Sequence, residues 1–240
     1  MHPQYLIGCS GYYYPYWRNR FYPAGLAPVN WLEYYSSVFN SVELNGTFYR
    51  TPKLSDLVKY ARVTTPYFKF SVKMSKYITH VLKMKAARQS ITDFQSLIRE
   101  GLGDKLAHFL FQLPPSVQFN EQNMEYIMES IPHHSENVVE FRHISWWNPV
   151  ISRALKKAGI TFCNVNFPGL ASYFIQTSDL FYLRFHGDPE LFKSSYSEEQ
   201  LKDYYKLFPA HCDQYSIYFN NTFYEAGYKN AQQLMDLTKK

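Results

Sequence analysis

The chain has 240 residues, of which 46% are apolar and 19% are charged. This length and composition suit one large globular domain and exclude a disordered chain. The net charge of +5 is mildly basic, which is compatible with an anionic ligand and does not require nucleic acid. The cysteines Cys9, Cys163 and Cys212 are far apart and form no CxxC pair. Their spacing argues against a disulfide framework or zinc cluster and favours a reducing cytoplasm.

The sequence contains no segment that suggests a membrane protein. Residues Met1–Tyr5 contain no basic region followed by a long apolar stretch, so we expect no signal peptide. The longest uncharged span, between Lys157 and Asp179, is interrupted by Asn, Gln, Pro and Gly residues. We therefore expect a cytoplasmic protein without membrane partners.

Eight segments rich in β-branched and aromatic residues are predicted to be strands. They are Tyr5–Cys9, Ser41–Asn45, Phe68–Met74, His108–Leu113, Val138–Arg142, Ile160–Val165, Leu180–Phe185 and Tyr215–Phe219. Most of these strands are followed by a segment with helical spacing of apolar residues or with helix-capping residues.

The predicted helices alternate with these strands, and several have clear boundaries. They are Asn30–Phe39 with Asn30 as N-cap, one starting at Thr51-Pro52, one through Ile91–Ile98 ending near Gly101, one through Met124–Ile131, one from Asn148-Pro149 to Gly159, one opened by a Ser197/Gln200 capping box, and Ala231–Lys240. The segment Asn166–Asp179 has no helical stripe. The pattern predicts one α/β domain over residues 1–240, a (β/α)₈ TIM-barrel-like fold with an irregular sixth β/α unit. A doubly wound open sheet is the alternative, because periodicity does not decide closure.

Charged and polar residues cluster at the predicted carboxyl ends of the strands, where barrel proteins place their active sites. They are Glu43 and Asn45, Ser71 and Lys73, Gln112, Glu140 and Arg142, Arg184 and His186, and Asn220 and Asn221. Several of these are pairs two residues apart, so the members share a face of the strand. The stretch Val138–Trp147 is the best example, since Val139 and Phe141 then point away from Glu140 and Arg142.

The residue types at the strand ends suggest acid–base chemistry on an anion. Glu43 and Glu140 are candidate general acids or bases, and His186 is a candidate to assist proton transfer. Lys73, Arg142 and Arg184 are expected to bind a phosphate or carboxylate, with Asn45, Gln112 and Asn220 orienting the ligand. The alternative is that these glutamates belong to a structural ion network with the neighbouring cations.

No cofactor or metal is predicted. Glu43, Glu140 and His186 offer a carboxylate–imidazole donor set, but no HxH or HExxH spacing supports it and several cations are expected nearby. The chain also has no GxSxG, GxGxxG or P-loop motif.

Two loops next to the strand ends are unusual in composition. The segment Lys73–Arg88 contains six basic or histidine residues, His80 among them, and no acidic residue; it is either a solvated basic face or a rim that collects anions. The segment Tyr12–Tyr22 mixes aromatic residues with Arg18 and Arg20, a composition suited to stacking on bases or to a lid that packs over the barrel. Tyr12, His80 and, after the fifth strand, Trp146 are therefore included among the expected ligand contacts.

Blocks of residues along nearly the whole chain resemble the YecE-like family, the domain of unknown function seventy-two. They are Gly8–Gly11, Pro15, Trp17-Arg18, Phe21–Pro23, Phe39–Asn45, Thr47–Arg50, Pro52, Phe70–Lys73, Ile78–His80, Leu110–Pro115, Val139–His143, Ser145-Trp146, Tyr182–Gly187 and Tyr218–Asn221. The resemblance implies a TIM-barrel-like fold and no established activity. This chain departs from the family pattern at Gly46, at Tyr13-Tyr14, and at Asn164 and Asn166, where an Asp is common. A third carboxylate at the barrel end is therefore not expected.

Three hypotheses for function follow. The first is an enzyme acting on a small anionic metabolite, phosphorylated or carboxylated, by general acid–base chemistry. The second is a nucleic-acid-binding or nucleic-acid-processing protein that uses the basic, aromatic rim. The third is a metal-dependent isomerase- or nuclease-like barrel. The sequence does not specify the substrate, the reaction or the oligomeric state.

Overall fold

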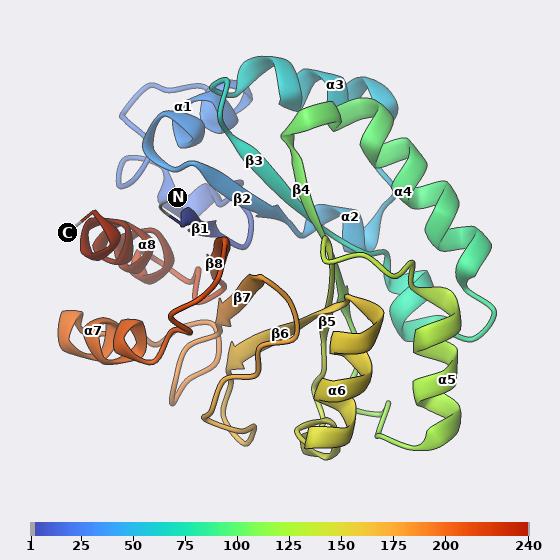
Figure 1. Cartoon of the computed structure of the whole chain (residues 1–240). Coiled ribbons are helices and arrows are strands. Elements are labelled where there is room, and N and C mark those ends of the chain that lie inside the picture. The colour runs from blue at the N-terminus through green and yellow to red at the C-terminus, as the bar shows by residue number, and fades with distance from the viewer. Residues whose placement is uncertain (1–2, 240) are drawn as a thin grey trace.

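The structure, a computed structural model, describes residues 3–239 and contains an almost closed barrel of eight parallel strands (Figure 1). The strands are β1 (Gln4–Cys9), β2 (Ser41–Leu44), β3 (Lys69–Lys73), β4 (Leu106–Gln112), β5 (Asn137–Glu140), β6 (Thr161–Asn166), β7 (Leu180–Phe185) and β8 (Gln214–Phe219). Their order around the barrel is β1-β8-β7-β6-β5-β4-β3-β2. Each strand therefore pairs with its neighbours in sequence, which confirms the barrel and excludes the doubly wound sheet.

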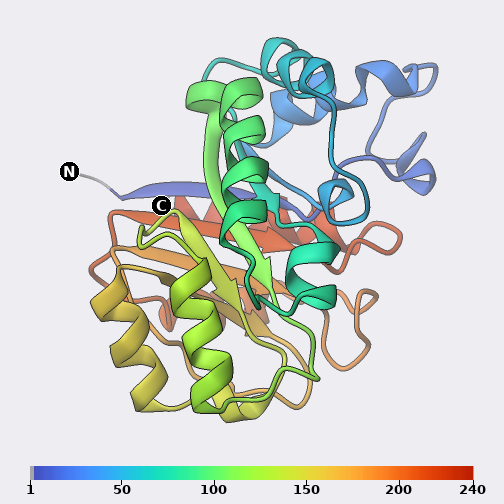
Figure 2. The same cartoon turned by 90° about the vertical axis from the view of Figure 1, so that its right-hand side faces the viewer.

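Helices surround the strands on the outside, as the side view in Figure 2 shows. They are α1 (Trp31–Val38), α2 (Gly46–Tyr49), α3 (Leu54–Val63), α4 (Arg88–Leu102), α5 (Glu121–Ser130), α6 (Pro149–Ala158), α7 (Glu198–Lys206) and α8 (Ala226–Thr238). Short 3₁₀ turns occupy Pro15–Trp17, Pro28–Asn30, Gly103–Lys105 and Ile144–Trp146, and one π-helical turn occupies Tyr77–Val81. We call the carboxyl end of the strands the barrel mouth.

The helix boundaries with capping chemistry in the sequence are confirmed. The Asn148 side chain accepts hydrogen bonds from the first turn of α6, and Gly159 ends that helix in the left-handed region at φ 66°. Ser197 and Gln200 form the predicted capping box of α7. Asn30 occupies the N-cap position of α1, but its side chain accepts no capping hydrogen bond.

Predicted ends of helices and strands that carry no capping residue agree less well with the structure. The helix predicted from Thr51-Pro52 starts at Leu54, and the final helix starts at Ala226 rather than Ala231. The predicted end of the final helix, Lys240, lies outside the described residues. So do Met1 and His2, which belong to the N-terminal stretch in which no signal peptide was expected. Strand β5 ends at Glu140, two residues earlier than predicted, because its ladder to β4 ends there. Arg142 therefore lies in the loop after β5.

The sixth unit lacks a helix, as predicted, and side chains fasten its loop to the barrel instead. The Asn164 amide exchanges two hydrogen bonds with the backbone of Ile175, at 2.9 and 2.7 Å. The Phe162 N–H donates to Thr177 Oγ1 at 2.8 Å. The returning loop therefore runs along β6 and takes the space where a helix would otherwise pack.

The barrel interior is polar, although such interiors are usually filled with branched apolar side chains. Tyr218 OH lies 2.6 Å from Ser41 Oγ and 2.8 Å from Ser71 Oγ. Lower in the barrel, His108 Nε2 lies 2.8 Å from Ser216 Oγ. Because buried polar groups need partners, these pairs require a specific register of the strands that carry them.

The edge between β1 and β2, which we call the seam, has no strand ladder and is closed mainly by side chains. Its backbone pairing is a single bridge between Ser10 and Glu43. Asn40, just before β2, accepts a hydrogen bond from the Ile7 N–H at 2.9 Å and donates to the Tyr5 carbonyl at 2.7 Å. This one amide therefore reproduces both bonds that a backbone partner would make.

Tyr35 of α1 completes the seam. Its hydroxyl accepts from the Cys9 N–H at 2.7 Å and donates to the Ser41 carbonyl at 3.2 Å. Gly8 faces this contact, and a Cβ at Gly8 would lie 1.9 Å from the Ser41 oxygen. The close approach thus requires glycine at this position.

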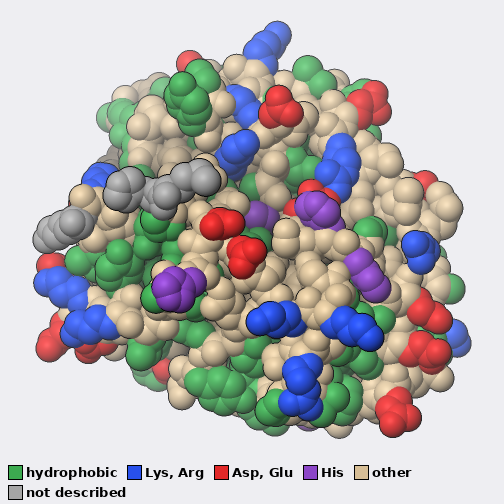
Figure 3. Space-filling model, viewed as in Figure 1, with side chains coloured by type: hydrophobic (Ala, Val, Ile, Leu, Met, Phe, Trp, Pro, Cys, Tyr) green, Lys and Arg blue, Asp and Glu red, His purple; other side chains and the backbone are tan. Residues whose placement is uncertain are grey.

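The face shown in Figure 3 carries both basic and acidic side chains scattered among uncharged ones. Within residues 3–239, no helix combines the length and hydropathy needed to cross a membrane.

The seam predicts a large effect of Asn40→Ala on stability. The substitution leaves the Ile7 N–H and the Tyr5 carbonyl without partners, so the free energy of unfolding is expected to fall by about 2–4 kcal/mol. Urea denaturation followed by circular dichroism measures it. Asn30→Ala is the matched control and should change stability by less than about 0.5 kcal/mol, because Asn30 makes no cap bond. Equal losses for the two variants would contradict the role of Asn40.

Candidate functional site

A buried ion network occupies the barrel mouth, and Arg184 of β7 lies at its centre. Arg184 Nη2 donates to Glu43 Oε1 at 2.6 Å, and Arg184 Nη1 donates to Glu140 Oε2 at 2.6 Å. All three side chains are at most 1% exposed. The two predicted catalytic carboxylates, on β2 and β5, are therefore bridged by one guanidinium group. We call these three residues, together with Arg142 and His186 beside Glu140 and Asn220 beside His186, the mouth network.

Further donors complete the coordination of Glu43. Ser10 Oγ donates to Oε1 at 2.7 Å, and Tyr182 OH donates to Oε2 at 2.8 Å. Sequence reasoning missed both donors. Tyr182 was detectable, because it lies two residues before Arg184 on a strand and therefore shares its face. Ser10 was detectable as well, because it directly follows the predicted strand Tyr5–Cys9.

Arg142 and His186 lie on the other side of Glu140. Arg142 Nε donates to Glu140 Oε1, and the Arg142 guanidinium stacks 4.4 Å from the ring of Phe167. His186 Nε2 lies 3.2 Å from Arg142 Nη2 and 3.5 Å from Glu140 Oε1. Unlike Arg184, Arg142 remains partly exposed.

His186 is buried as a neutral imidazole. Burial and the positive charge of Arg142 lower its pKa from 6.5 to about 3. Nδ1 faces the Asn220 amide at 2.9 Å. Asn220, predicted to orient a ligand, thus orients His186.

The charges of the mouth network largely cancel. Burial alone would raise the pKa of Glu140, but Arg142 and Arg184 outweigh it and hold that pKa well below its usual range. Burial likewise opposes the charge of Arg184, but Glu140 and Glu43 raise its pKa. Glu140 is therefore ionised and paired, which corresponds to the structural ion network that the sequence offered as the alternative interpretation.

A second group of side chains lies beside the mouth network, at the end of β3. Lys73 Nζ donates to Gln112 Oε1 at 2.8 Å and lies 4.2 Å from the ring centre of Phe48. The His80 ring meets the same phenyl ring edge-on, with centroids 4.9 Å apart. We call Lys73, Gln112, Phe48 and His80 the Lys73 group. Phe48, the member that sequence reasoning missed, holds its two basic side chains together.

The Lys73 group is electrostatically coupled to the mouth network. Burial first, and then the charge of Arg184, lower the pKa of Lys73 from 10.5 to about 8. Burial and the charges of Lys73, Lys76 and Arg142 lower the pKa of His80 from 6.5 to about 4. Within residues 3–239, no carboxylate oxygen lies within 4 Å of Lys73 Nζ. Lys73 is thus a cation without an ion-pair partner of its own among these residues.

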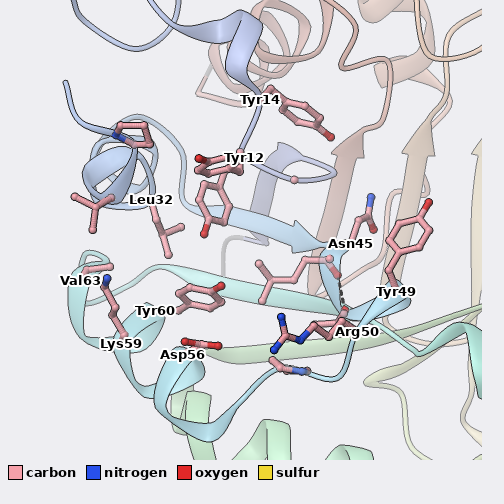
Figure 4. A pocket seen from close by; sticks show the side chains of 18 residues that line it. Tyr12, Tyr14, Leu32, Asn45, Tyr49, Arg50, Asp56, Lys59, Tyr60 and Val63 are labelled. Atoms are coloured by element: carbon pink, nitrogen blue, oxygen red, sulfur yellow. Dashed lines mark hydrogen bonds between the residues drawn. The ribbon is translucent and has the colours of Figure 1, made fainter. Parts of the chain in front are cut away.

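A cavity of about 640 Å³ opens between the N-terminal loop and helices α2 and α3, next to the mouth (Figure 4). Tyr12, Tyr60 and Leu44 are among its walls, and Arg50 and Asp56 are among its charged residues. The cavity is large enough for a metabolite or drug-sized molecule.

Asn45 connects this cavity to the barrel mouth. It follows β2 directly, lines the cavity, and has a buried Oδ1 atom for which no residue among 3–239 supplies a donor. Two of the predicted ligand contacts, Tyr12 and Asn45, thus line the cavity, while the others named at the strand ends lie in the mouth network or the Lys73 group.

The remaining predicted contacts lie elsewhere or serve packing. Trp146 is buried, stacks on Phe141, and donates from Nε1 to the Val117 carbonyl at 2.8 Å. The rings of the segment Tyr12–Tyr22 pack mainly on one another and on α1, as in the stacked pair Tyr22–Trp31. The Asn166 side chain donates to Tyr204 OH at 2.7 Å and accepts from Tyr196 OH, so its polar atoms are paired away from Arg184 and the two glutamates.

No three His, Cys, Asp or Glu side chains within residues 3–239 gather as a metal site would. Glu43 and Glu140 both face Arg184, which lies where a shared cation would have to bind. The residues present therefore do not form the carboxylate–imidazole set that the third hypothesis requires.

Eight parallel strands with charged side chains converging at their carboxyl ends define an α/β-barrel protein with its candidate site at the mouth. Comparisons with known proteins identify the family. The model described as "Protein of unknown function DUF72" matches residues 6–240, and the chain belongs to this family, as the sequence resemblance predicted.

Relatives in this family share the fold across the whole chain. A DUF72 family protein from Thermotoga maritima is 32% identical, covers 99% of this chain and 100% of its own, and has a TM-score of 0.85. One from Enterococcus faecalis is 16% identical with a TM-score of 0.80, covering 99% of this chain and 96% of its own.

Curated relatives carry no stated activity in their names. UPF0759 protein YunF of Bacillus subtilis is 30% identical over 139 residues, and UPF0759 protein YecE of Escherichia coli is 26% identical over 135 residues. These matches cover 53% and 54% of this chain. The chain spans about half the length of these two relatives, 48% and 49%.

The mouth network predicts that Arg184→Met is strongly destabilising. Removing the guanidinium leaves the buried Glu43 without a cation and takes one of two cations from Glu140, so the free energy of unfolding should fall by about 3–5 kcal/mol. Chemical denaturation measures it, with the exposed Arg62→Met of α3 as control. A loss below about 1 kcal/mol in the Arg184 variant would show that the bridge does not stabilise the fold.

Burial of neutral His186 predicts a loss of stability on mild acidification. Its pKa in the folded protein lies below the 6.5 of an unfolded chain, so the unfolded state binds more protons between about pH 3 and 6.5. Stability from this group is complete above that window and is lost as the pH falls through it. Between pH 7 and 5.5 the His186 share is about 1 kcal/mol.

His186→Gln should therefore reduce the pH 7 to 5.5 stability difference by that amount, measured within each variant. The exposed His134→Gln is the control and should leave the difference unchanged. An identical pH dependence in both variants would be inconsistent with a buried neutral His186.

Proposed function

We propose that this protein is an enzyme that binds a small anionic metabolite at the barrel mouth and transfers a proton on it. The observation that carries the proposal is Lys73, a cation at the end of β3 with no carboxylate partner among residues 3–239. Arg142, also at the mouth, keeps part of its side chain exposed. A phosphate or carboxylate is the ligand that matches these donors.

The charge balance of the mouth supports an anionic ligand. Glu43 and Glu140 offset Arg184 and Arg142, which leaves the positive charge of Lys73 uncompensated. A cleft with a net positive charge raises the local concentration of anions. Arg184 is buried and already holds two carboxylates, so its proposed role is to position Glu43 and Glu140 rather than to touch the ligand.

The proposed proton-transfer group is Lys73. A general acid or base works best when its pKa lies near the working pH, and the pKa of Lys73 is about 8. Glu140 is a weak base because its pKa is held far below the usual range, and His186 stays neutral. Glu140 and His186, two of the three side chains proposed from the sequence as acid–base groups, thus shape the site, while Lys73 acts on the substrate.

The neighbouring cavity is the proposed site for the rest of the substrate. Thr47 lines this cavity, and its hydroxyl donates to the Lys73 carbonyl at 2.7 Å, so the two regions are adjacent. The free Oδ1 atom of Asn45 offers an acceptor for a hydroxyl, amine or amide of the substrate.

This proposal predicts stabilisation by anions that depends on Lys73. In thermal-shift measurements against phosphorylated and carboxylated metabolites, at least one should stabilise the wild type. Lys73→Met should weaken that ligand about tenfold or more, the effect of losing one charge-assisted contact. The exposed Lys76→Met, three residues along the same loop, is the matched control and should bind as the wild type does.

Two outcomes would overturn the proposal: no anion stabilises the wild type, or the Lys73 and Lys76 variants respond alike. A single-stranded oligonucleotide in the same panel tests the nucleic-acid hypothesis. Stabilisation by the oligonucleotide alone, weakening steeply with salt, would favour that hypothesis over a metabolite enzyme.

A further inference from the structure

We propose that Lys73 is an amine nucleophile that forms an imine with the carbonyl group of an anionic aldehyde, ketone or oxo acid. This inference rests on the proposed function and names its substrate class. The reacting atom is Lys73 Nζ, at the end of β3, and the anionic group of the substrate binds toward Arg142.

The surroundings of Lys73 Nζ differ from those of Lys105, Lys202 and Lys206. It has one neutral acceptor, Gln112 Oε1 at 2.8 Å, and the face of Phe48 at 4.2 Å. By contrast, Lys105 Nζ is bound by several backbone and hydroxyl oxygens. Surface lysines such as Lys202 and Lys206 pair with carboxylates. Carbonyl, hydroxyl and carboxylate oxygens all stabilise a charged ammonium group, and the described acceptor of Lys73 Nζ is the single amide oxygen of Gln112.

Two features favour the neutral amine, which is the form that attacks a carbonyl. The side chain is largely withdrawn from water against Phe48. Arg184 is the largest charge effect on it and repels its positive charge, while Glu140 and Glu43 each act more weakly in the opposite direction. A lysine that is desolvated and next to another cation is a recognised arrangement for an activated amine. At pH 7 a pKa of about 8 leaves roughly one Lys73 in ten neutral, against fewer than about one in a thousand for a lysine at its ordinary value.

The chemistry needs no oxidant, reductant or metal. The nitrogen of Lys73 bonds to the carbonyl carbon and gives a carbinolamine. The C–O bond then breaks, and the oxygen leaves as water with the two hydrogens that the amine contributes. The product is one imine and one water. The imine nitrogen, when protonated, draws electrons from the imine carbon. This assists removal of a proton, or cleavage of a bond, at the carbon next to it.

The neighbouring groups suit this step. Gln112 Oε1 accepts one N–H and so orients the nitrogen. His80, which also contacts the Phe48 ring, is neutral near pH 7 because its pKa is about 4, so it adds no positive charge to the surroundings of the amine. The mouth network supplies a fixed, internally neutral floor. The Lys73 group therefore has the parts of an imine-forming site.

Reductive trapping tests the inference. The full chain is incubated at pH 7 with glyoxylate or pyridoxal phosphate, two anionic aldehydes, and with cyanoborohydride; the modified lysine is located by mass spectrometry. We expect Lys73 to be modified at least about tenfold faster than Lys76, because of its larger neutral fraction. Lys73→Met and Lys73→Arg should lose the adduct, and Lys76→Met should keep it.

The outcomes separate this inference from the proposed function. Stabilisation by anions without preferential modification of Lys73 would overturn the imine and leave the anion site standing. Neither stabilisation nor modification would overturn both. Modification spread evenly over the lysines, or unchanged in Lys73→Arg, would also reject the nucleophile. Site mapping is done in the wild type, so the result does not depend on the variants folding.

Discussion

The bridge that Arg184 makes between Glu43 and Glu140 is the interaction on which the barrel mouth depends. Two buried carboxylates on β2 and β5 would repel each other and lose hydration, and one guanidinium from β7 offsets both costs with hydrogen bonds of 2.6 Å. Ser10, next to the seam, donates to the same Glu43 oxygen. The bridge thus ties strands on different sides of the barrel to the edge where β1 and β2 lack a ladder.

Because the glutamates and arginines of the mouth network pair with one another, the side chain that titrates near neutral pH lies at the edge of the network. Glu140 is held ionised and His186 neutral, so neither changes its charge near pH 7. Lys73 lies beside them without a carboxylate partner among the described residues, and the same arginines that pair with the glutamates repel its proton. The rigid floor and the titratable amine are therefore consequences of one arrangement of charges.

The interior of this barrel is held together by side-chain hydrogen bonds, whereas a typical barrel interior is packed with branched apolar residues. Hydrogen-bonded side chains fill it, and the amide of Asn40 and the phenol of Tyr35 replace backbone pairing at the seam. The same device appears at the sixth unit, where Asn164 fastens a loop in place of a helix. The fold is shared with the Thermotoga maritima DUF72 protein at 32% identity, over essentially the full length of both chains.

The sequence alone determined the alternation of eight strands with helices, the irregular sixth unit and the set of residues at the strand ends. The tertiary structure decided that the sheet closes into a barrel. Strand alternation and capping residues such as Asn148 and Ser197 are local signals, so they survive without knowledge of the fold. The tertiary structure alone likewise decided which charges meet. Arg184, expected to bind a ligand, pairs with Glu43 and Glu140, and Lys73 has no carboxylate partner among residues 3–239. Pairing of this kind depends on distances of a few ångströms between strands far apart in the chain, and on burial, and no linear pattern encodes either.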